Sequence, residues 1–280
     1  MSVYNNLIEK MVSAKISSPR LEARLLLAFV LGCEDSEVDV FNVNLSEEQS
    51  KKLENILKKR LEDRWPLDKI IGRKSFYKYD FIVNENVLSP RPDTEILLEE
   101  SLKLCNYDEL SVLDLGVGSG CILLSLLKEK KNAVGVGVDV SAEAIEVAKV
   151  NAKNLGIEKQ VKFVQASWFD NNFIDLFDKK FDMIVTNPPY IPDKDIVSLE
   201  TEVKKYDPML ALSGGSDGFD AYRRIAEITP FILKENGYIL IEAGIYQAQE
   251  IAKIFIAQNL EFCKIVKDLS GIDRCVILKK

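Results

Sequence analysis

The stretch Ser111-Val-Leu-Asp-Leu-Gly-Val-Gly-Ser-Gly120 decides the fold of this chain. Its first five residues are mostly apolar and typical of a buried strand, and the glycines that follow are typical of a tight turn. The next eight residues, Cys121-Ile-Leu-Leu-Ser-Leu-Leu-Lys128, predict a helix. Glycines let a backbone approach a ligand closely and tolerate positive φ. We therefore predict that the turn binds a cofactor through Gly116, Val117, Gly118, Ser119 and Gly120.

The spacing of the glycines narrows the classes of ligand that the turn could bind, although a glycine-rich loop alone is weak evidence. The turn has the pattern Gly-x-Gly-x-Gly, and Cys121 stands where the dinucleotide fingerprint Gly-x-Gly-x-x-Gly has its last glycine. No Gly-Lys-Ser/Thr follows, so the turn is not a P-loop. A dinucleotide-dependent oxidoreductase therefore remains the weakest of the alternatives.

Two further positions follow predicted strands. Asp139 ends the strand predicted at 133–138, about 20 residues after the glycine turn, where an acidic residue binds ribose hydroxyls. Helix capping is the alternative role for Asp139, but Ser141 is the better cap and leaves the carboxylate free for a ligand. Trp168 follows the strand predicted at 161–165 and could pack on an adenine. A position at the rim of the core explains Trp168 almost equally well.

The tetrapeptide Asn187-Pro-Pro-Tyr190 ends the apolar strand predicted at 181–186. The Asn187 side-chain carbonyl and the Pro188 backbone carbonyl can accept the two hydrogens of a planar NH2 group. Prolines donate no backbone N–H and fix φ, so the loop is stiff and rich in acceptors. We predict Asn187, Pro188 and Tyr190 as catalytic residues, and these with Pro189 as the substrate-binding loop. A Pro-Pro turn after a core strand is the structural alternative.

From residue 110 onward, predicted strands alternate with predicted helices. This pattern indicates an α/β fold with a mostly parallel, doubly wound sheet. Ligands bind such sheets at the carboxyl ends of the strands, where the glycine turn, Asp139, Trp168 and Asn187 all fall. The strands are expected near 111–115, 133–138, 161–165, 181–186 and 237–243.

The N-terminal part predicts a separate, helical domain. Apolar residues recur at helical spacing through the first 70 residues, and Ser46 begins a capping box. A small helical bundle more often recognises a partner than performs chemistry. We expect a helical docking domain at 1–73, a β-hairpin linker at 74–90 with its turn at 84–86, and the catalytic domain at 91–280.

Composition excludes several functions. The chain has 280 residues, a net charge of −7 and no histidine, which excludes every mechanism that depends on histidine. Its excess of acidic over basic residues argues against a duplex-DNA partner, because DNA binding depends on basic residues that neutralise phosphates. Five cysteines without Cys-x-x-Cys spacing indicate reduced thiols and no metal site. The N-terminus lacks the apolar segment of a signal peptide and no apolar run reaches 18 residues, so we expect a cytoplasmic protein without membrane spans.

Taken together, the glycine turn, Asp139 and Asn187-Pro-Pro-Tyr190 resemble an S-adenosylmethionine-dependent N-methyltransferase. Residues 88–95, Leu-Ser-Pro-Arg-Pro-Asp-Thr-Glu, resemble the Pro-Arg-Pro-Glu-Thr-Glu signature of the release factor glutamine methyltransferases (the HemK/PrmC family). Residues 206–218 and 268–274 are also similar to that family. The chain departs from the family at three places: Asp93 replaces the usual Glu, Val117 replaces a common Thr, and the segment 242–244 lacks a bulkier middle residue. We expect the segment 242–244 to lie far from the chemistry.

The resemblance implies a specific function. It implies a seven-stranded Rossmann-like methyltransferase sheet that ends in an antiparallel hairpin of 261–267 and 273–279. It implies that S-adenosylmethionine binds at the glycine turn, Asp139, Trp168 and Asn187, with Arg91 at the substrate. The substrate would be the glutamine amide in the Gly-Gly-Gln loop of peptide-chain release factors. We separately expect the protein to be a monomer. An adenine-N6 methyltransferase acting on nucleic acid and a non-catalytic S-adenosylmethionine-binding protein remain as alternatives.

Overall fold

The computed structural model describes residues 2–104 and 109–280, which form two compact units. The first unit extends to Gly72 and also contains Glu200–Tyr206; the second contains Arg73–Leu199 and Asp207–Lys280. The sequence-based division assigned residues 200–206 to the catalytic domain, whereas their contacts lie with the helical unit. Cys105 lies outside the described residues, and the cysteines at 33, 121, 263 and 275 are free thiols.

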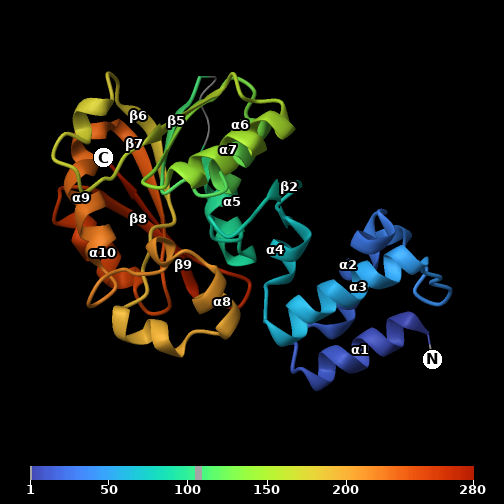
Figure 1. Cartoon of the computed structure of the whole chain (residues 1–280). Helices are drawn as coiled ribbons and strands as arrows, with labels where there is room; N and C mark the ends of the chain where they lie inside the picture. Colours follow the sequence, from blue (N-terminus) through green and yellow to red (C-terminus); the bar gives the residue numbers. More distant parts are fainter. Residues whose placement is uncertain (1, 105–108) are drawn as a thin grey trace. The chain divides into compact units, whose positions relative to one another are not determined.

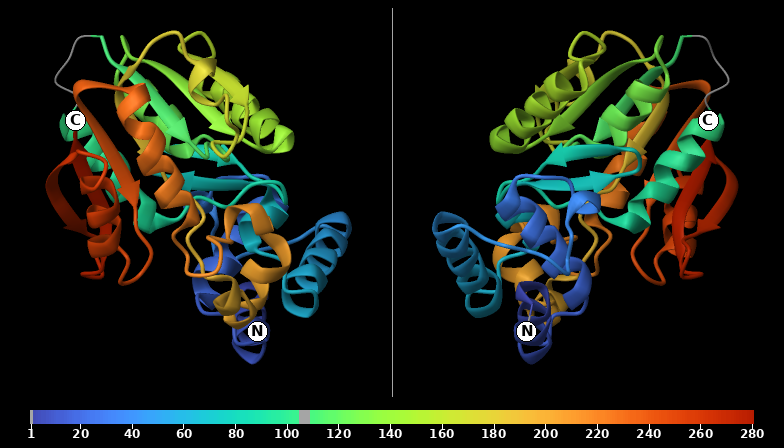
Figure 2. Two further views of the ribbon diagram at one scale, coloured as in Figure 1. Left: turned by 90° about the vertical axis from the view of Figure 1, so that its left-hand side faces the viewer. Right: turned by 90° about the vertical axis from the view of Figure 1, so that its right-hand side faces the viewer.

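The second unit is built on a seven-stranded sheet (Figure 1). Its strands are β3 (Ser111–Leu115), β4 (Val134–Asp139), β5 (Val161–Gln165), β6 (Phe181–Thr186), β7 (Leu233–Glu242), β8 (Glu261–Lys267) and β9 (Asp273–Lys279). They follow the order β5-β4-β3-β6-β7-β9-β8, and all pairs are parallel except those of β9 with β7 and β8. The predicted α/β class and the terminal antiparallel hairpin, at one edge of the sheet in Figure 2, are confirmed.

Helices cover both faces of this sheet because successive strand residues point to opposite sides. Val112 packs in a core with the helices on one face, and Leu113 packs in a second core with those on the other. The first face carries α5 (Glu95–Leu104), α6 (Cys121–Glu129) and α7 (Ala142–Leu155), and the second carries α9 (Asp220–Ile232) and α10 (Ala248–Ile256) (Figure 1).

The order of the strands reverses between β3 and β6. The chain moves outward from β3 through β4 to β5 and then returns to place β6 on the other side of β3. The last residues of the two strands are paired, and the Thr186 hydroxyl donates a 2.7 Å hydrogen bond to the Leu115 carbonyl. The loops that follow β3 and β6 therefore start side by side, at the point of an α/β sheet where ligands bind.

The hairpin that opens the second unit differs from its prediction. Strands β1 (Arg73–Phe76) and β2 (Tyr79–Ile82) turn at Tyr77 and Lys78, so the hairpin does not turn at 84–86 as predicted. A separate turn follows β2 there, where the Val87 N–H donates to the Asn84 carbonyl at 3.5 Å. Tyr77 has φ +56°, and its N–H donates a 2.9 Å hydrogen bond to Glu95 Oε1 at the start of α5. Phe76 and Phe81 are buried and pack edge to face. These contacts fix the turn of the hairpin at Tyr77 and Lys78, seven to eight residues before the polar stretch at 84–86.

The first unit is an all-helical bundle. It comprises α1 (Val3–Ser13), α2 (Pro19–Leu31), α3 (Glu47–Leu57), a π-helical turn at Lys58–Glu62, α4 (Leu67–Ile71) and α8 (Thr201–Tyr206). Its core contains Leu7, Met11, Leu26, Leu27 and Leu53. Ser46 caps α3 in the predicted capping box. Within the described ranges, no helix is long and apolar enough to cross a membrane.

A nearly buried cluster of charges ties α8 into this bundle. The Arg60 guanidinium forms two hydrogen bonds with Glu22 on α2, of 2.7 and 2.9 Å, and contacts Glu202 on α8 at 3.2 Å. Arg64 contacts the same Glu202 oxygen at 2.6 Å. The Arg60 side chain is only 7% exposed, so removing it leaves the Glu22 carboxylate without its positive partner and Glu202 with Arg64 alone.

We expect Arg60→Met to destabilise the helical unit by about 3 to 5 kcal/mol, because breaking a buried ion pair leaves uncompensated charge. Denaturant unfolding gives the size of the loss, and hydrogen exchange should show faster opening of α8. Lys51→Met is the control, because its ion pair with Glu47 is solvent-exposed and should contribute little. Unchanged exchange in α8 of the Arg60 variant would contradict the role of this cluster.

Candidate active site

A cavity of about 530 Å³ lies at the carboxyl ends of β3 to β6. Its volume is within the roughly 300–1,000 Å³ of small-molecule sites. Its wall is formed by the loops after these strands and by parts of the segments 85–94 and 208–213. The residues of this wall that the sequence predicted for cofactor or substrate are Arg91, Gly116, Val117, Gly118, Ser119, Asp139, Trp168, Asn187 and Pro189.

Three predicted site residues lie outside the wall, namely Gly120, Pro188 and Tyr190. Gly120 has φ +82°, and a Cβ there would lie 2.7 Å from a Leu124 methyl carbon, so this glycine allows the turn to pack on α6. Pro188 is buried. Tyr190 packs against the second core, beside Gly244.

The glycine turn forms a cradle on one side of the cavity. The N–H groups of Gly116 and Val117 both donate to the Val138 carbonyl at 2.9 Å, which pins the turn to the end of β4. Gly116 has φ +84°, and a Cβ there would lie 3.5 Å from the Trp168 indole. Gly118 has φ +52° and open space where a Cβ would stand. The turn therefore offers bare backbone to a ligand.

Asp139 connects this turn to the start of α7. One carboxylate oxygen accepts the Gly118 N–H at 2.9 Å, and the other accepts the Ser141 N–H at 3.0 Å. Ser141 caps α7 through the Ala144 N–H, as the sequence predicted. Burial raises the pKa of Asp139, and the backbone N–H groups lower it. A carboxylate has about four acceptor positions, so Asp139 retains capacity for two further donors.

Two buried polar groups near the turn have no hydrogen-bond partner within the described residues. They are the Trp168 indole Nε1 and both oxygens of Asp114 on β3. Burial raises the pKa of Asp114 to about 8, and the nearby Asp139 carboxylate raises it further. Sequence reasoning assigned no role to Asp114, although a carboxylate within an apolar strand was a signal. With a pKa of about 8, the Asp114 carboxyl group is mostly neutral at physiological pH.

The Asn187 side chain is oriented by residues from two other elements. Its Nδ2 donates to the Thr94 hydroxyl at 3.4 Å, and the Glu242 carboxylate faces both groups. Thr94 and Glu242 are each 2% exposed. Burial raises the pKa of Glu242 to about 7, against the lowering effect of Thr94, Arg274 and Asn187. The expectation that 242–244 lies far from the chemistry is wrong, because Glu242 ends β7, the strand next to β6.

The rest of the Asn-Pro-Pro-Tyr loop is held through its backbone. The Tyr190 carbonyl accepts a 3.1 Å hydrogen bond from Gln247 Nε2, and the Ile191 carbonyl accepts one of 2.9 Å from the Gly214 N–H. A Cβ on Gly214 would lie 2.8 Å from Tyr190 Cα, so this approach requires glycine. Burial, and then Glu242, raise the pKa of Tyr190 to about 12. Tyr190 is therefore a neutral phenol at physiological pH.

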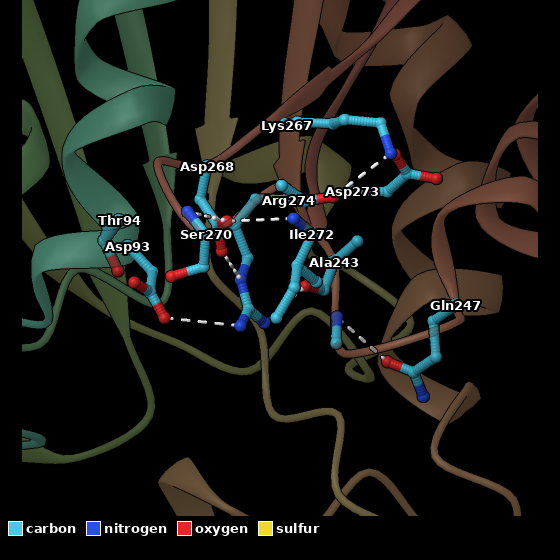
Figure 3. Close-up of polar contacts among 12 residues, drawn as sticks. Asp93, Thr94, Ala243, Gln247, Lys267, Asp268, Ser270, Ile272, Asp273 and Arg274 are labelled. Carbon is cyan, nitrogen blue, oxygen red and sulfur yellow. Dashed lines mark hydrogen bonds and ion pairs between the residues drawn. The ribbon is translucent and has the colours of Figure 1, made fainter.

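Arg274 is a positive charge that acts on Tyr190 and lies beside Asp93 and Asp268, and sequence reasoning gave it no individual role (Figure 3). Its guanidinium contacts Asp268 at 3.2 Å, Asp93 at 3.3 Å and the Ala243 carbonyl at 3.2 Å. Its side chain is 9% exposed. Asp93, which stands in place of the family's Glu, thus keeps a charged contact between the start of α5 and β9.

Arg91 stands in the cavity wall, and its guanidinium contacts the Asp207 carboxylate at 3.2 Å. The Arg91 side chain is 46% exposed, whereas that of Asp207 is 4% exposed. Arg91 is therefore anchored at one end and accessible from the cavity. No group of histidine, cysteine or acidic side chains that could hold a metal ion occurs in residues 2–104 and 109–280.

Comparisons with known proteins agree with this arrangement. A methyltransferase domain family matches residues 106–268, and the PrmC N-terminal domain family matches residues 3–72. A methyltransferase structure from Pyrococcus furiosus is 15% identical, with a TM-score of 0.53 over 84% of this chain and 99% of that chain; this likeness concerns the fold alone.

Two relatives are similar over nearly the full chain, and both are named release factor glutamine methyltransferase. The protein from Caulobacter vibrioides is 41% identical over 96% of this chain and 92% of its own length. The protein from Rhodospirillum rubrum is 39% identical over 95% of this chain and 81% of its own length. With both domains matched and identity at this level over the whole length, the chain belongs to the release factor glutamine methyltransferase family.

Proposed function

We propose that this chain transfers a methyl group from S-adenosylmethionine to the side-chain amide nitrogen of the glutamine in the Gly-Gly-Gln loop of peptide-chain release factors. The observation that carries this proposal is that an acceptor-rich loop and a glycine cradle share one cavity, at the reversal of strand order. The names of the relatives support the choice of substrate. The cytoplasmic localisation, the monomeric state and the absence of a nucleic-acid partner stay predictions.

The residues around the cradle fit S-adenosylmethionine. Asp139 has acceptor capacity left for two ribose hydroxyls, and the Trp168 ring beside Gly116 offers a surface for the adenine. When bound, S-adenosylmethionine supplies an electrophilic methyl group on a positively charged sulfur.

The Asn-Pro-Pro-Tyr loop would orient the amide that receives the methyl group. An amide nitrogen is a poor nucleophile because its lone pair is delocalised into the carbonyl. Asn187 Oδ1 and the Pro188 carbonyl would accept both amide hydrogens and favour the positive charge that develops on the nitrogen. Such positioning and preorganised dipoles can supply most of a barrier reduction. Tyr190 would pack on the amide plane; as a neutral phenol it is not a base, and the amide proton can leave late to water.

We expect Asp139→Ala to weaken S-adenosylmethionine binding by roughly tenfold or more, because hydrogen bonds to a charged acceptor are lost. Isothermal titration calorimetry measures this affinity. The control is Glu146→Ala on α7, whose side chain is 70% exposed and should not affect binding. Unchanged affinity in a folded Asp139 variant would show that this carboxylate does not hold the cofactor.

We expect Asn187→Ala to slow methyl transfer by about two to three orders of magnitude, by analogy with the loss of one oriented polar group in other enzymes. Labelled S-adenosylmethionine, a release factor and DNA are incubated together, and peptide mass spectrometry locates the methyl group on the Gly-Gly-Gln glutamine. Asn154→Ala, at an exposed position of α7, is the matched control. Label on adenine with none on protein would favour the nucleic-acid alternative.

We also propose that the first unit docks the release factor. A chain that begins at Arg73 should still bind S-adenosylmethionine but methylate a release factor far more slowly, because its docking surface is lost. This chain also leaves Glu202 without Arg60, so calorimetry with S-adenosylmethionine must first show that the second unit is folded. Methylation as fast as that of the full chain would exclude a docking role for the first unit.

A further inference from the structure

We propose that Thr94 and Glu242 are positioning residues that hold the Asn187 amide with its nitrogen turned inward and its carbonyl oxygen turned toward the substrate. This inference rests on the proposed function and names the residues on which the acceptor role of Asn187 depends. Thr94 belongs to the turn Pro92–Thr94 before α5, and Glu242 is the last residue of β7. Neither residue was singled out by its spacing in the sequence.

The geometry places a buried acceptor pair behind Asn187. Its Nδ2 lies 3.4 Å from the Thr94 hydroxyl oxygen, and the Glu242 carboxylate faces both side chains. The Thr94 N–H donates a 3.1 Å hydrogen bond to the Arg91 carbonyl, which fixes the turn that presents the hydroxyl. Because all three residues belong to the second unit, the arrangement is internal to that unit.

The direction of the hydrogen bonds follows from the chemistry of Glu242. Above its pKa of about 7, Glu242 is an ionised carboxylate that only accepts hydrogen bonds, so the Thr94 hydroxyl directs its hydrogen toward Glu242 and offers lone pairs to Asn187. An Asn187 amide turned by 180° would set its carbonyl oxygen against the hydroxyl oxygen and the carboxylate. That repulsion selects the orientation in which Oδ1 is available to accept a hydrogen from the substrate.

Arg274 supports the charge of Glu242. Its guanidinium is held between Asp93, Asp268 and the Ala243 carbonyl, as Figure 3 shows, and its charge acts on Glu242. The Oε2 atom of Glu242 has no hydrogen-bond partner in the described part of the chain. The carboxylate therefore depends on Thr94, Asn187 and the Arg274 charge, and its geometry is coupled to theirs.

A wrongly turned Asn187 would affect the rate more than binding. Its NH2 group would then face the NH2 group of the substrate amide, two donors in contact, and the reacting nitrogen would move away from its productive position. Displacements of this size lower rates by about 10²-fold. Binding of the release factor as a whole rests on a much larger surface, so its Michaelis constant should change little.

Two substitutions of Thr94 separate positioning from packing. Thr94→Val keeps the volume and removes the hydroxyl, whereas Thr94→Ser keeps the hydroxyl and removes a buried methyl group. We expect kcat for the release factor to fall roughly 10- to 100-fold in Thr94→Val, with KM and S-adenosylmethionine affinity within about threefold of wild type. Thr94→Ser should keep kcat within about threefold. A packing role predicts the reverse order, and that result would overturn the proposal.

Glu242→Gln is a second test of the Asn187 orientation, made at a residue that does not line the cavity. A glutamine amide both donates and accepts, so it removes the preference for one Asn187 orientation, and kcat should fall with little change in KM. Adding Glu242→Gln to Thr94→Val should cost much less than the product of the two single effects. Full activity of Glu242→Gln would overturn its positioning role even if the Thr94→Val protein fails to fold.

The wild-type reaction, run alongside, separates the two proposals. If the wild-type protein leaves no methyl group on the Gly-Gly-Gln glutamine, the proposed function fails and this inference falls with it. If the wild type methylates that glutamine and both Thr94→Val and Glu242→Gln match its kcat, only the positioning inference is wrong.

Discussion

The parallel pairing of β3 with β6 is the constraint on which the candidate site depends. It joins the ends of the two strands at Leu115 and Thr186, which are also linked through the Thr186 hydroxyl. Because each loop continues from a paired strand, the glycine cradle and the Asn-Pro-Pro-Tyr loop are adjacent as soon as the sheet forms. The Asp139 and Trp168 loops of the neighbouring strands and the segments 85–94 and 208–213 then complete the wall of the cavity.

Two buried carboxyl groups near the candidate site have raised pKa values. Asp114 and Glu242 are buried carboxyl groups with unpaired oxygens within the described residues, and burial raises the pKa of both. Arg274 is a buried cation whose guanidinium is already paired with the carboxylates of Asp93 and Asp268. The Asp139 carboxylate lines the cavity itself, and a negative charge there favours a sulfonium donor.

The segment after the Asn-Pro-Pro-Tyr loop links the two units through the chain itself. The backbone leaves the second unit after Leu199, contributes α8 to the helical bundle, and returns at Asp207 just before the cavity wall at 208–213. Glu202 is held there by Arg60 and Arg64. The unit proposed to dock the release factor therefore shares one continuous stretch of chain with the unit proposed to modify it.

The sequence by itself determined the strands, the glycine turn, the Ser141 cap and the edge of the sheet where Asp139 and Asn187 lie. These features follow from local periodicity, from turn and capping preferences, and from the family resemblance. Only the tertiary structure decided that Glu242 and Thr94 meet Asn187, that α8 joins the helical bundle, and that the first hairpin turns at Tyr77 rather than at 84–86. Each of these depends on contacts between residues far apart in the chain, which follow from strand order and side-chain packing and leave no periodic signal in the local sequence.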